Sequence, residues 1–180
     1  MQNNSSLTYQ QYSQLKDYSL GKNIPDNFER KVGAGILIYS AETKEFLALE
    51  RSLRVRNPGI LSISGGMSKL YKNNLESPII TAVAESFEEM GYLPNGKLLT
   101  NPFAYANSRL TYYTFLLVIN KKERLNFEPN LNWEHSGYCW IKTNEINYGN
   151  IHPGLEEVLS DIKKTSNKLL ISYREFLKKE

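Results

Sequence analysis

Three glutamates, Glu85, Glu88 and Glu89, lie within five consecutive residues and could bind a metal ion. Like charges at three- and four-residue spacing destabilise a helix by roughly 0.2 to 0.5 kcal/mol per pair, and the surrounding segment 76–92 (ESPIITAVAESFEEMGY) has no lysine or arginine to offset them. Carboxylate oxygens are preferred ligands of Mg²⁺ and Mn²⁺. The alternative is a solvated acidic helix face, which is the commoner arrangement.

The same segment has the signals of a helix. Ser77 suits the N-cap position and Pro78 the first helical position, while Gly91 and Pro94 end the helix. At about 100° per residue, one apolar stripe faces the core, and we expect the glutamates on the opposite side. The stripe consists of Ile79, Val83, Phe87 and Met90.

A strand ending at Gly65 and Gly66, a loop and Glu76 precede this helix, and the whole assembly resembles the Nudix box. The positions at the family spacing are Glu76, Glu85, Glu88, Glu89, Gly91 and Tyr92. Weaker matches extend from about residue 31 to 159. They include Arg51 after a strand and the segment 133–141 (WEHSGYCWI), in which an acidic residue lies near a tryptophan.

This chain departs from the family pattern at three places. Ala84 replaces the arginine that orients the carboxylates in the family. Nine residues, rather than the family's five, separate Gly66 from Glu76, which implies a longer loop before the helix. Ser86 replaces an apolar residue, for which we expect a small loss of core contact.

The resemblance implies a divalent ion, Mg²⁺ or Mn²⁺, bound by Glu85, Glu88 and Glu89 together with a backbone carbonyl near Gly65. Glu85 is the first candidate for the general base, and Glu134 is the alternative base or an additional ligand. An exposed loop acid is an equal interpretation of Glu134. Glu76 is expected to anchor the loop or to lie in the outer coordination shell rather than to bind the metal directly.

Candidates for substrate binding come from the strands. The guanidinium of Arg51 matches phosphate geometry, and we expect Arg54 and Arg56 to be ordinary surface charges. Tyr105 could stack on a base, as could Tyr112 and Tyr113, although strand aromatics more often belong to the core.

His135 and His152 lack a partner at zinc-ligand spacing, so neither is expected to form a site. Cys139, within a strand, is expected to be a small buried hydrophobe.

Apolar runs predict strands at 34–40, 45–50, 60–64, 103–107, 111–120 and 136–142, with the fifth of these central because it is apolar on both faces. A second helix is expected at 155–163. The order of elements predicts an α/β fold, and the resemblance implies the Nudix α/β/α sandwich with a mixed sheet. We divide the chain into an N-terminal appendage (1–30) with a short helix at 9–20, a Nudix-like domain (31–165) and a C-terminal amphipathic segment (166–180).

Composition limits the partners. The 180 residues carry 22 basic and 19 acidic side chains, a net charge of +3, which does not require nucleic acid or an anionic membrane. No apolar run approaches the roughly 20 residues of a membrane span, and the N-terminus has no signal-peptide pattern, so a cytoplasmic protein is expected. Oligomeric state stays open, and a homodimer is one arrangement compatible with the sequence.

The sequence therefore predicts a Mg²⁺- or Mn²⁺-dependent pyrophosphohydrolase. Its substrate would be a nucleoside diphosphate linked to another moiety, as in a nucleoside triphosphate, a dinucleotide or a nucleotide sugar. The alternative, motivated by Ala84, is a Nudix-like module that binds a nucleotide or regulates a partner without cleavage. Nucleic-acid binding through the lysine-rich C-terminal tail ranks last, because it rests on local charge alone.

Overall fold

The computed structural model describes residues 31–71, 74–146, 148–152, 154–162 and 164. The predicted helix at 9–20 and the predicted amphipathic segment 166–180 lie outside these residues.

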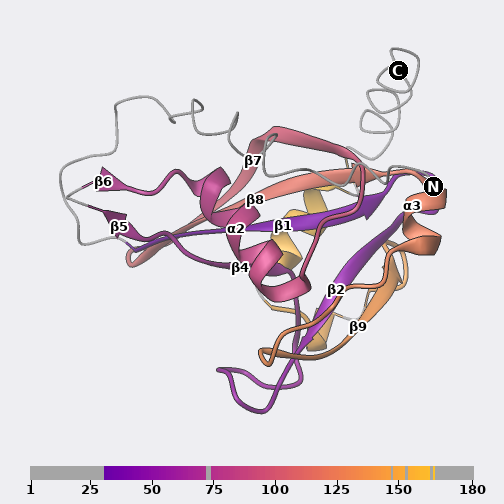
Figure 1. The fold of residues 1–180 in the computed structure, drawn as a ribbon, viewed down its shortest axis with the longest axis horizontal. Helices are drawn as coiled ribbons and strands as arrows, with labels where there is room; N and C mark the ends of the chain where they lie inside the picture. The colour runs from indigo at the N-terminus through magenta and orange to yellow at the C-terminus, as the bar shows by residue number, and fades with distance from the viewer. Residues whose placement is uncertain (1–30, 72–73, 147, 153, 163, 165–180) are drawn as a thin grey trace.

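The elements follow one another as strands, a helix, strands and helices (Figure 1). Their bounds are β1 Lys31–Ser40, β2 Glu45–Arg51, β3 Leu61–Ser62, β4 Ser64–Met67, β5 Leu70–Tyr71, β6 Asn74–Leu75, α2 Pro78–Met90, β7 Lys97–Ala106, β8 Leu110–Ile119, α3 Lys121–Asn126, β9 His135–Lys142 and the 3₁₀ turn η2 Tyr148–Asn150. Residues 154–162 are also helical. The sequence did not predict α3 or the short β5–β6 hairpin.

The main sheet is mixed. Its path runs β3-β2-β1-β8-β7, while β4 pairs with β1 and β9 pairs with β2. β8 is parallel to β1 and antiparallel to β7, so it lies inside the sheet as its two apolar faces predicted. The mixed sheet of the predicted fold class is therefore confirmed.

Two hydrophobic clusters cover the two faces of the sheet, because successive strand residues point to opposite sides. On one face Ile36, Phe115 and Leu117 pack with the α2 residues Ile79 and Val83. On the other face the strand residues alternate with these and pack against the helical residues 154–162. The members of this second cluster include Leu37, Tyr39, Phe46, Leu116, Val118, Leu155, Val158, Leu159 and Ile162. A sheet between helices is the α/β/α sandwich that was predicted.

α2 begins and ends where the sequence predicts. Ser77 occupies the N-cap position, although its side chain makes no capping hydrogen bond, and Pro78 is the first helical residue. Gly91 has φ +78°, and its N–H donates to the Phe87 carbonyl. Ile79 and Met90 are buried as expected. The helix is thereby held with one face against the sheet.

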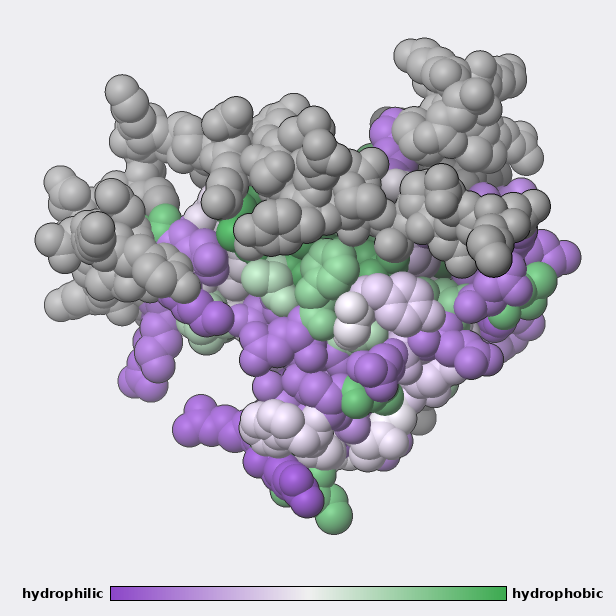
Figure 2. Space-filling view, in the orientation of Figure 1, coloured by the Kyte–Doolittle hydropathy of each residue, from purple (hydrophilic) through white to green (hydrophobic). Residues whose placement is uncertain are grey.

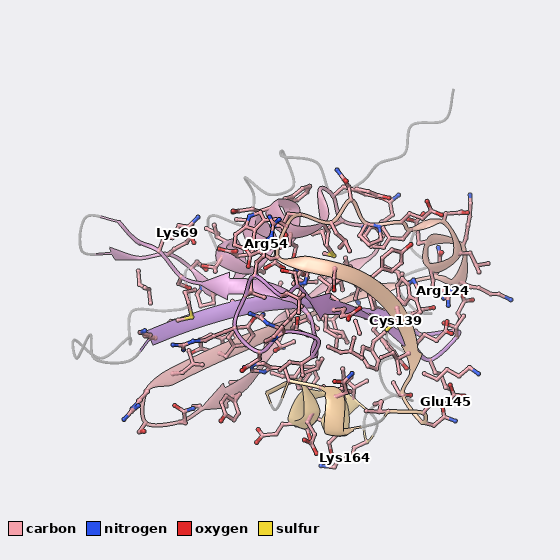
Figure 3. The ribbon with its side chains drawn as sticks, turned by 90° about the horizontal axis from the view of Figure 1, so that it is seen from below. Arg54, Lys69, Arg124, Cys139, Glu145 and Lys164 are labelled. Carbon is pink, nitrogen blue, oxygen red and sulfur yellow. The ribbon has the colours of Figure 1, made fainter. Side chains whose placement is uncertain are left out.

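The prediction that Cys139 is buried is wrong, whereas Ser86 lies in the core with polar partners. Ser86 is fully buried, but its hydroxyl donates to the Ala82 carbonyl (2.7 Å) and lies 2.8 Å from Ser64 Oγ, so a buried polar pair joins α2 to β4. Cys139 is exposed rather than buried, because it lies on β9, an edge strand that pairs with β2 alone. Figure 3 shows Cys139 on the outer strand β9.

Candidate functional site

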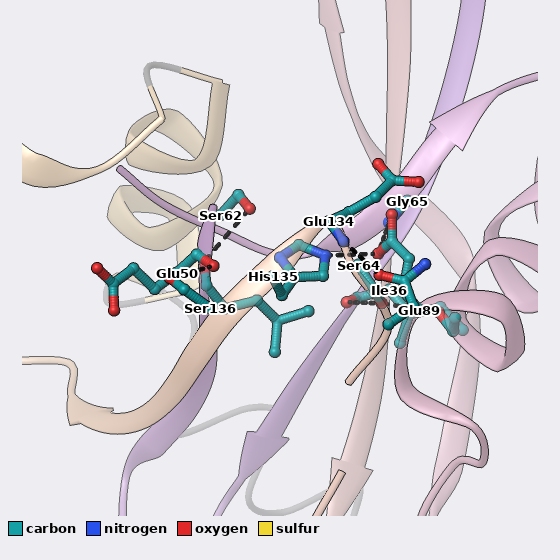
Figure 4. Close-up of polar contacts among 12 residues, drawn as sticks. Ile36, Glu50, Ser62, Ser64, Gly65, Glu89, Glu134, His135 and Ser136 are labelled. Carbon is teal, nitrogen blue, oxygen red and sulfur yellow. Dashed lines mark hydrogen bonds and ion pairs between the residues drawn. The ribbon is translucent and has the colours of Figure 1, made fainter. Parts of the chain in front are cut away.

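The polar side of α2 lies against β4, and Glu89 is the residue at this contact. Its carboxylate is 4% exposed and accepts a hydrogen bond from the Gly65 N–H at 3.1 Å. His135 Nε2, at the start of β9, lies 3.2 Å from the same oxygen, Oε2 (Figure 4). Burial raises the pKa of Glu89, and the His135 contact opposes the shift. Glu89 therefore joins three elements, and the alternative of a solvated helix face does not hold for this residue.

His135 is the clearest residue that sequence reasoning missed. Its side chain is 2% exposed. Neither ring nitrogen makes a hydrogen bond of good geometry with the described residues, so Nε2 and the Glu89 carboxylate are close enough for an ion pair but are not aligned for a hydrogen bond. A buried polar group without such a partner is costly, so it requires an explanation. The sequence signal was the position of His135 directly after Glu134.

Glu85 lies one turn before Glu89 and against the second glycine of the strand. A Cβ atom added to Gly66 would approach the Glu85 carboxylate to 2.5 Å, so glycine lets this carboxylate lie directly against β4, and a larger residue would require the Glu85 side chain to shift. Burial raises the pKa of Glu85, and the charges of Glu89 and Glu88 raise it further. Lys69 acts in the opposite direction. The Glu85 carboxylate therefore lies near other negative charges.

The other two predicted acids lie at the edge of this group. Glu88 is exposed on α2. Glu134 is partly buried in the loop before β9, where its backbone carbonyl accepts from the Ser52 N–H (2.8 Å) and its charge raises the pKa of Glu85 and Glu89. The fold therefore brings the acids of α2 and Glu134 to one region. We name Glu85, Glu88, Glu89 and Glu134 the acidic cluster.

The acidic cluster fits a hard divalent cation in ligand type and in charge. Its donors are carboxylate oxygens, and the pKa of Glu85 and Glu89 is raised mainly by burial, with neighbouring carboxylates adding to the shift. Within the described ranges no three acidic, histidine or cysteine side chains already surround one point as metal ligands. At Gly65 the contact seen is the N–H bonded to Glu89, whereas the sequence predicted a carbonyl ligand nearby.

The Thr81 hydroxyl binds Glu76. Ala84 stands at the position where the Nudix box has an arginine. Glu76 Oε2 lies 2.8 Å from Thr81 Oγ1, which also lies 2.9 Å from Ser68 Oγ. Since a hydroxyl has one hydrogen and the carboxylate has none to donate, Thr81 donates to Glu76 and accepts from Ser68. The Glu76 N–H bonds the Lys69 carbonyl as well (2.9 Å). Glu76 is thus linked to α2 through the Thr81 hydroxyl.

A cavity of about 260 Å³ adjoins the β4 glycines. Arg51 and Tyr105, both predicted to bind substrate, line it together with Gly65 and Gly66. Arg51 Nε donates to the Arg56 carbonyl at 2.8 Å, which fixes the guanidinium on the loop that follows β2. The fold therefore places the arginine and the tyrosine in one cavity beside the acidic cluster.

His152 also lines this cavity. Burial lowers its pKa, and Arg51 lowers it further. Its Nδ1 lies 3.3 Å from the Gly154 N–H and accepts a hydrogen bond, which leaves Nε2 as the protonated nitrogen of the neutral ring. Sequence reasoning tested His152 only as a zinc ligand and had no signal for a cavity wall.

The loop that follows β2 projects at the lower edge of the space-filling view, where hydrophilic and hydrophobic side chains lie side by side (Figure 2). Arg54 and Arg56 are exposed, and Leu53 is 90% exposed. Arg54 and Arg56 do not line the cavity. Their exposure agrees with surface charges.

Neither protein-family models nor curated protein sequences give a match to this chain. Solved structures do. The chain is similar to RenU, a Nudix hydrolase from M. smegmatis, with TM-score 0.57 and 15% identity over 78% of this chain and 86% of that one. A NUDIX hydrolase from Nitrosomonas europaea gives 0.56 and 18% over 76% and 90%. The MutT protein from Methanosarcina mazei Go1 gives 0.54 and 18% over 75% and 94%.

At identities of 15 to 18% these likenesses show the fold. The chain has the Nudix hydrolase fold, as the resemblance of the acidic helix predicted. No helix among the described residues is long and apolar enough to cross a membrane.

Proposed function

We propose that this chain, which has the Nudix hydrolase fold, is a Mg²⁺- or Mn²⁺-dependent hydrolase. It would cut a phosphoanhydride bond in a nucleoside diphosphate linked to another moiety. The observation that carries the proposal is the pair Glu85 and Glu89, whose carboxylates are held by α2 against Gly65 and Gly66, next to a cavity that contains Arg51. The positive charge of Arg51 would attract a phosphate group, and the negative charges of the acidic cluster would attract a cation.

Each residue has a distinct part in this proposal. Glu85, Glu88 and Glu89 would hold the ion, which when bound withdraws charge from phosphate oxygens and favours ionisation of a water. Gly65 and His135 fix the Glu89 carboxylate. Arg51 would bind phosphate oxygens through its guanidinium.

Glu85 is the proposed general base. Its carboxylate lies against Gly66, one turn before Glu89, so it would lie beside the ion and within reach of the attacking water. It would accept a proton from the attacking water. Glu134 remains the alternative base, because it lies in the same acidic cluster on a loop held by Ser52.

The test is turnover of a substrate panel consisting of a nucleoside triphosphate, a dinucleotide polyphosphate and a nucleotide sugar, each with Mg²⁺ or Mn²⁺. We expect release of phosphate, pyrophosphate or a nucleoside monophosphate from at least one. Glu85→Gln should lower kcat by about 10²-fold or more, the usual contribution of a general base. Glu157→Gln, an exposed acid of the helix at 154–162, is the matched control and should not change it. A folded protein with no turnover on any member would count against the enzyme.

Ala84 motivates one alternative, a module that binds a nucleotide or a regulatory partner without cleavage. In that case nucleotides should raise the unfolding temperature while no product forms. Ala84→Arg separates the two, because an active enzyme that already anchors Glu76 through Thr81 should gain little from the arginine. Recovery of turnover in Ala84→Arg alone would favour the inactive module.

A further inference from the structure

Three glycines make room for one tyrosine side chain. Tyr112 on β8 is in register with Gly33 on β1, and Gly35 on β1 is in register with Gly65 on β4. β1 lies between β8 and β4, so the ring of Tyr112 crosses β1 and reaches β4. A Cβ atom on Gly33 would meet the ring at 2.7 Å, one on Gly35 would meet the hydroxyl at 2.6 Å, and one on Gly65 would come closer still.

Glycine inside a strand is unfavourable and often marks a close approach by another group. Here the glycines at 33 and 35 share one face of β1. At Gly33 the nearest group is the Tyr112 ring, whereas Gly35 and Gly65 leave room both for the backbone of the neighbouring strand and for the Tyr112 hydroxyl. The arrangement therefore brings this oxygen close to both β1 and β4.

The hydroxyl lies where the cavity meets the acidic cluster. Tyr112 lines the cavity with Arg51, while Gly65, which touches its hydroxyl, donates its N–H to Glu89. A phenol has an ordinary pKa of about 10, so it is protonated at neutral pH and its O–H can donate a hydrogen bond.

We infer that Tyr112 is a substrate-binding residue whose O–H donates a hydrogen bond to a phosphate oxygen of the substrate, between Arg51 and the acidic cluster. The inference rests on the proposed function for the identity of the ligand, a diphosphate group. Phosphate oxygens are strong acceptors, and a hydrogen bond to a charged acceptor is stronger than one between neutral groups.

The ring has a packing role that must be separated from the donor role. Tyr112→Phe keeps the ring over Gly33 and removes only the oxygen. Tyr113→Phe is the matched control, because Tyr113 is the next residue of β8, packs against the cluster on the α2 side and does not line the cavity.

The experiment measures binding of methylenediphosphonate, a diphosphate that cannot be hydrolysed, with Mg²⁺ by calorimetry, and thermal unfolding of each variant. We expect Tyr112→Phe to weaken binding about tenfold or more at an unchanged unfolding temperature, and Tyr113→Phe to bind as the natural protein does. In a steady-state assay with a substrate that the enzyme cleaves, Tyr112→Phe should raise KM more than it lowers kcat, because the proposed contact forms when the substrate binds.

Equal binding by Tyr112→Phe and the natural protein would overturn the inference, as would loss of binding together with a lowered unfolding temperature, which would show a packing role. Absence of diphosphate binding by the natural protein overturns it as well. Tyr112-dependent binding without turnover of any substrate would instead support the inference and count against the proposed hydrolase. The two failures are therefore distinguishable.

Discussion

Replacing Glu85 by glutamine should stabilise the metal-free protein while it removes activity. Glu85 lies three and four residues from Glu88 and Glu89, and like charges at these spacings cost roughly 0.2 to 0.5 kcal/mol per pair on an exposed helix. Two pairs give about 0.4 to 1 kcal/mol, and burial of the carboxylate adds to the cost of its charge. We therefore expect Glu85→Gln to raise the free energy of unfolding by about 1 kcal/mol in EDTA at pH 7.5.

The pH dependence has a definite sign. The pKa of Glu85 is higher in the folded state than its unfolded-state value of about 4.3, so the folded protein binds this proton more tightly. The resulting contribution to the free energy of unfolding is fully present below about pH 4.3 and is lost as the pH rises through the folded pKa. Glu85→Gln does not titrate. Its advantage over the natural protein should therefore be absent near pH 4 and grow to its full size at higher pH.

The assay is thermal unfolding in EDTA across this pH range, then at saturating Mg²⁺. For a chain of this length 1 kcal/mol corresponds to about 2 to 4 °C. Mg²⁺ should raise the unfolding temperature of the natural protein more than that of Glu85→Gln, because ligand binding stabilises the folded state. Glu157→Gln controls for loss of a surface charge. A metal-free Glu85→Gln protein less stable than the natural one at pH 7.5 would refute the reasoning.

Two further predictions concern the support of the site and a distant ion pair. Thr81→Val should lower the free energy of unfolding by about 1 to 3 kcal/mol, because it removes the buried hydroxyl that donates to Glu76. Thr81→Ser keeps a hydroxyl and should retain most of the stability. Equal unfolding temperatures for the natural protein and both variants would contradict the anchoring role. Arg124→Gln removes the 2.7 Å ion pair with Glu45 and the contact between the guanidinium and the Trp140 ring, 5.1 Å from its centroid. The free energy of unfolding should fall by about 1 kcal/mol at pH 7. Turnover should not change, since Figure 3 shows Arg124 at the opposite end of the molecule from Lys69. Burial tends to raise the pKa of Glu45, but Arg124, Thr43 and Lys142 together lower it. The difference between the two proteins should therefore shrink as the pH falls through the folded pKa of Glu45, and a pH-independent difference in chemical denaturation would contradict the ion pair.

Local signals were sufficient for much of the fold. α2 was readable because Pro78, Gly91 and the apolar stripe are all local, and β8 because its apolar residues are consecutive. α3 was missed although its N-cap is also local: Asn120 accepts from the Glu123 N–H at 2.7 Å. The segment is short and has no buried residue, so it lacks the apolar periodicity on which helix prediction depends.

The site was readable only in part, because its remaining contacts join segments distant in sequence. The spacing of the α2 acids was visible along one helix, but the approach of His135 to Glu89 depends on how β9 lies beside β2. Tyr112 reaches Gly65 only because β4 and β8 lie on either side of β1. Gly33 and Gly35, two residues apart in a strand, were the available signal for that approach, and we did not use it.

The most direct test of the central claim is a count of Mn²⁺ ions bound to the purified protein, by electron paramagnetic resonance of free Mn²⁺ during a titration. The account predicts at least one bound ion for the natural protein, lost or strongly weakened in Glu85→Gln and Glu89→Gln but retained in Glu157→Gln. Binding that is absent, or unchanged in both α2 variants, would contradict it.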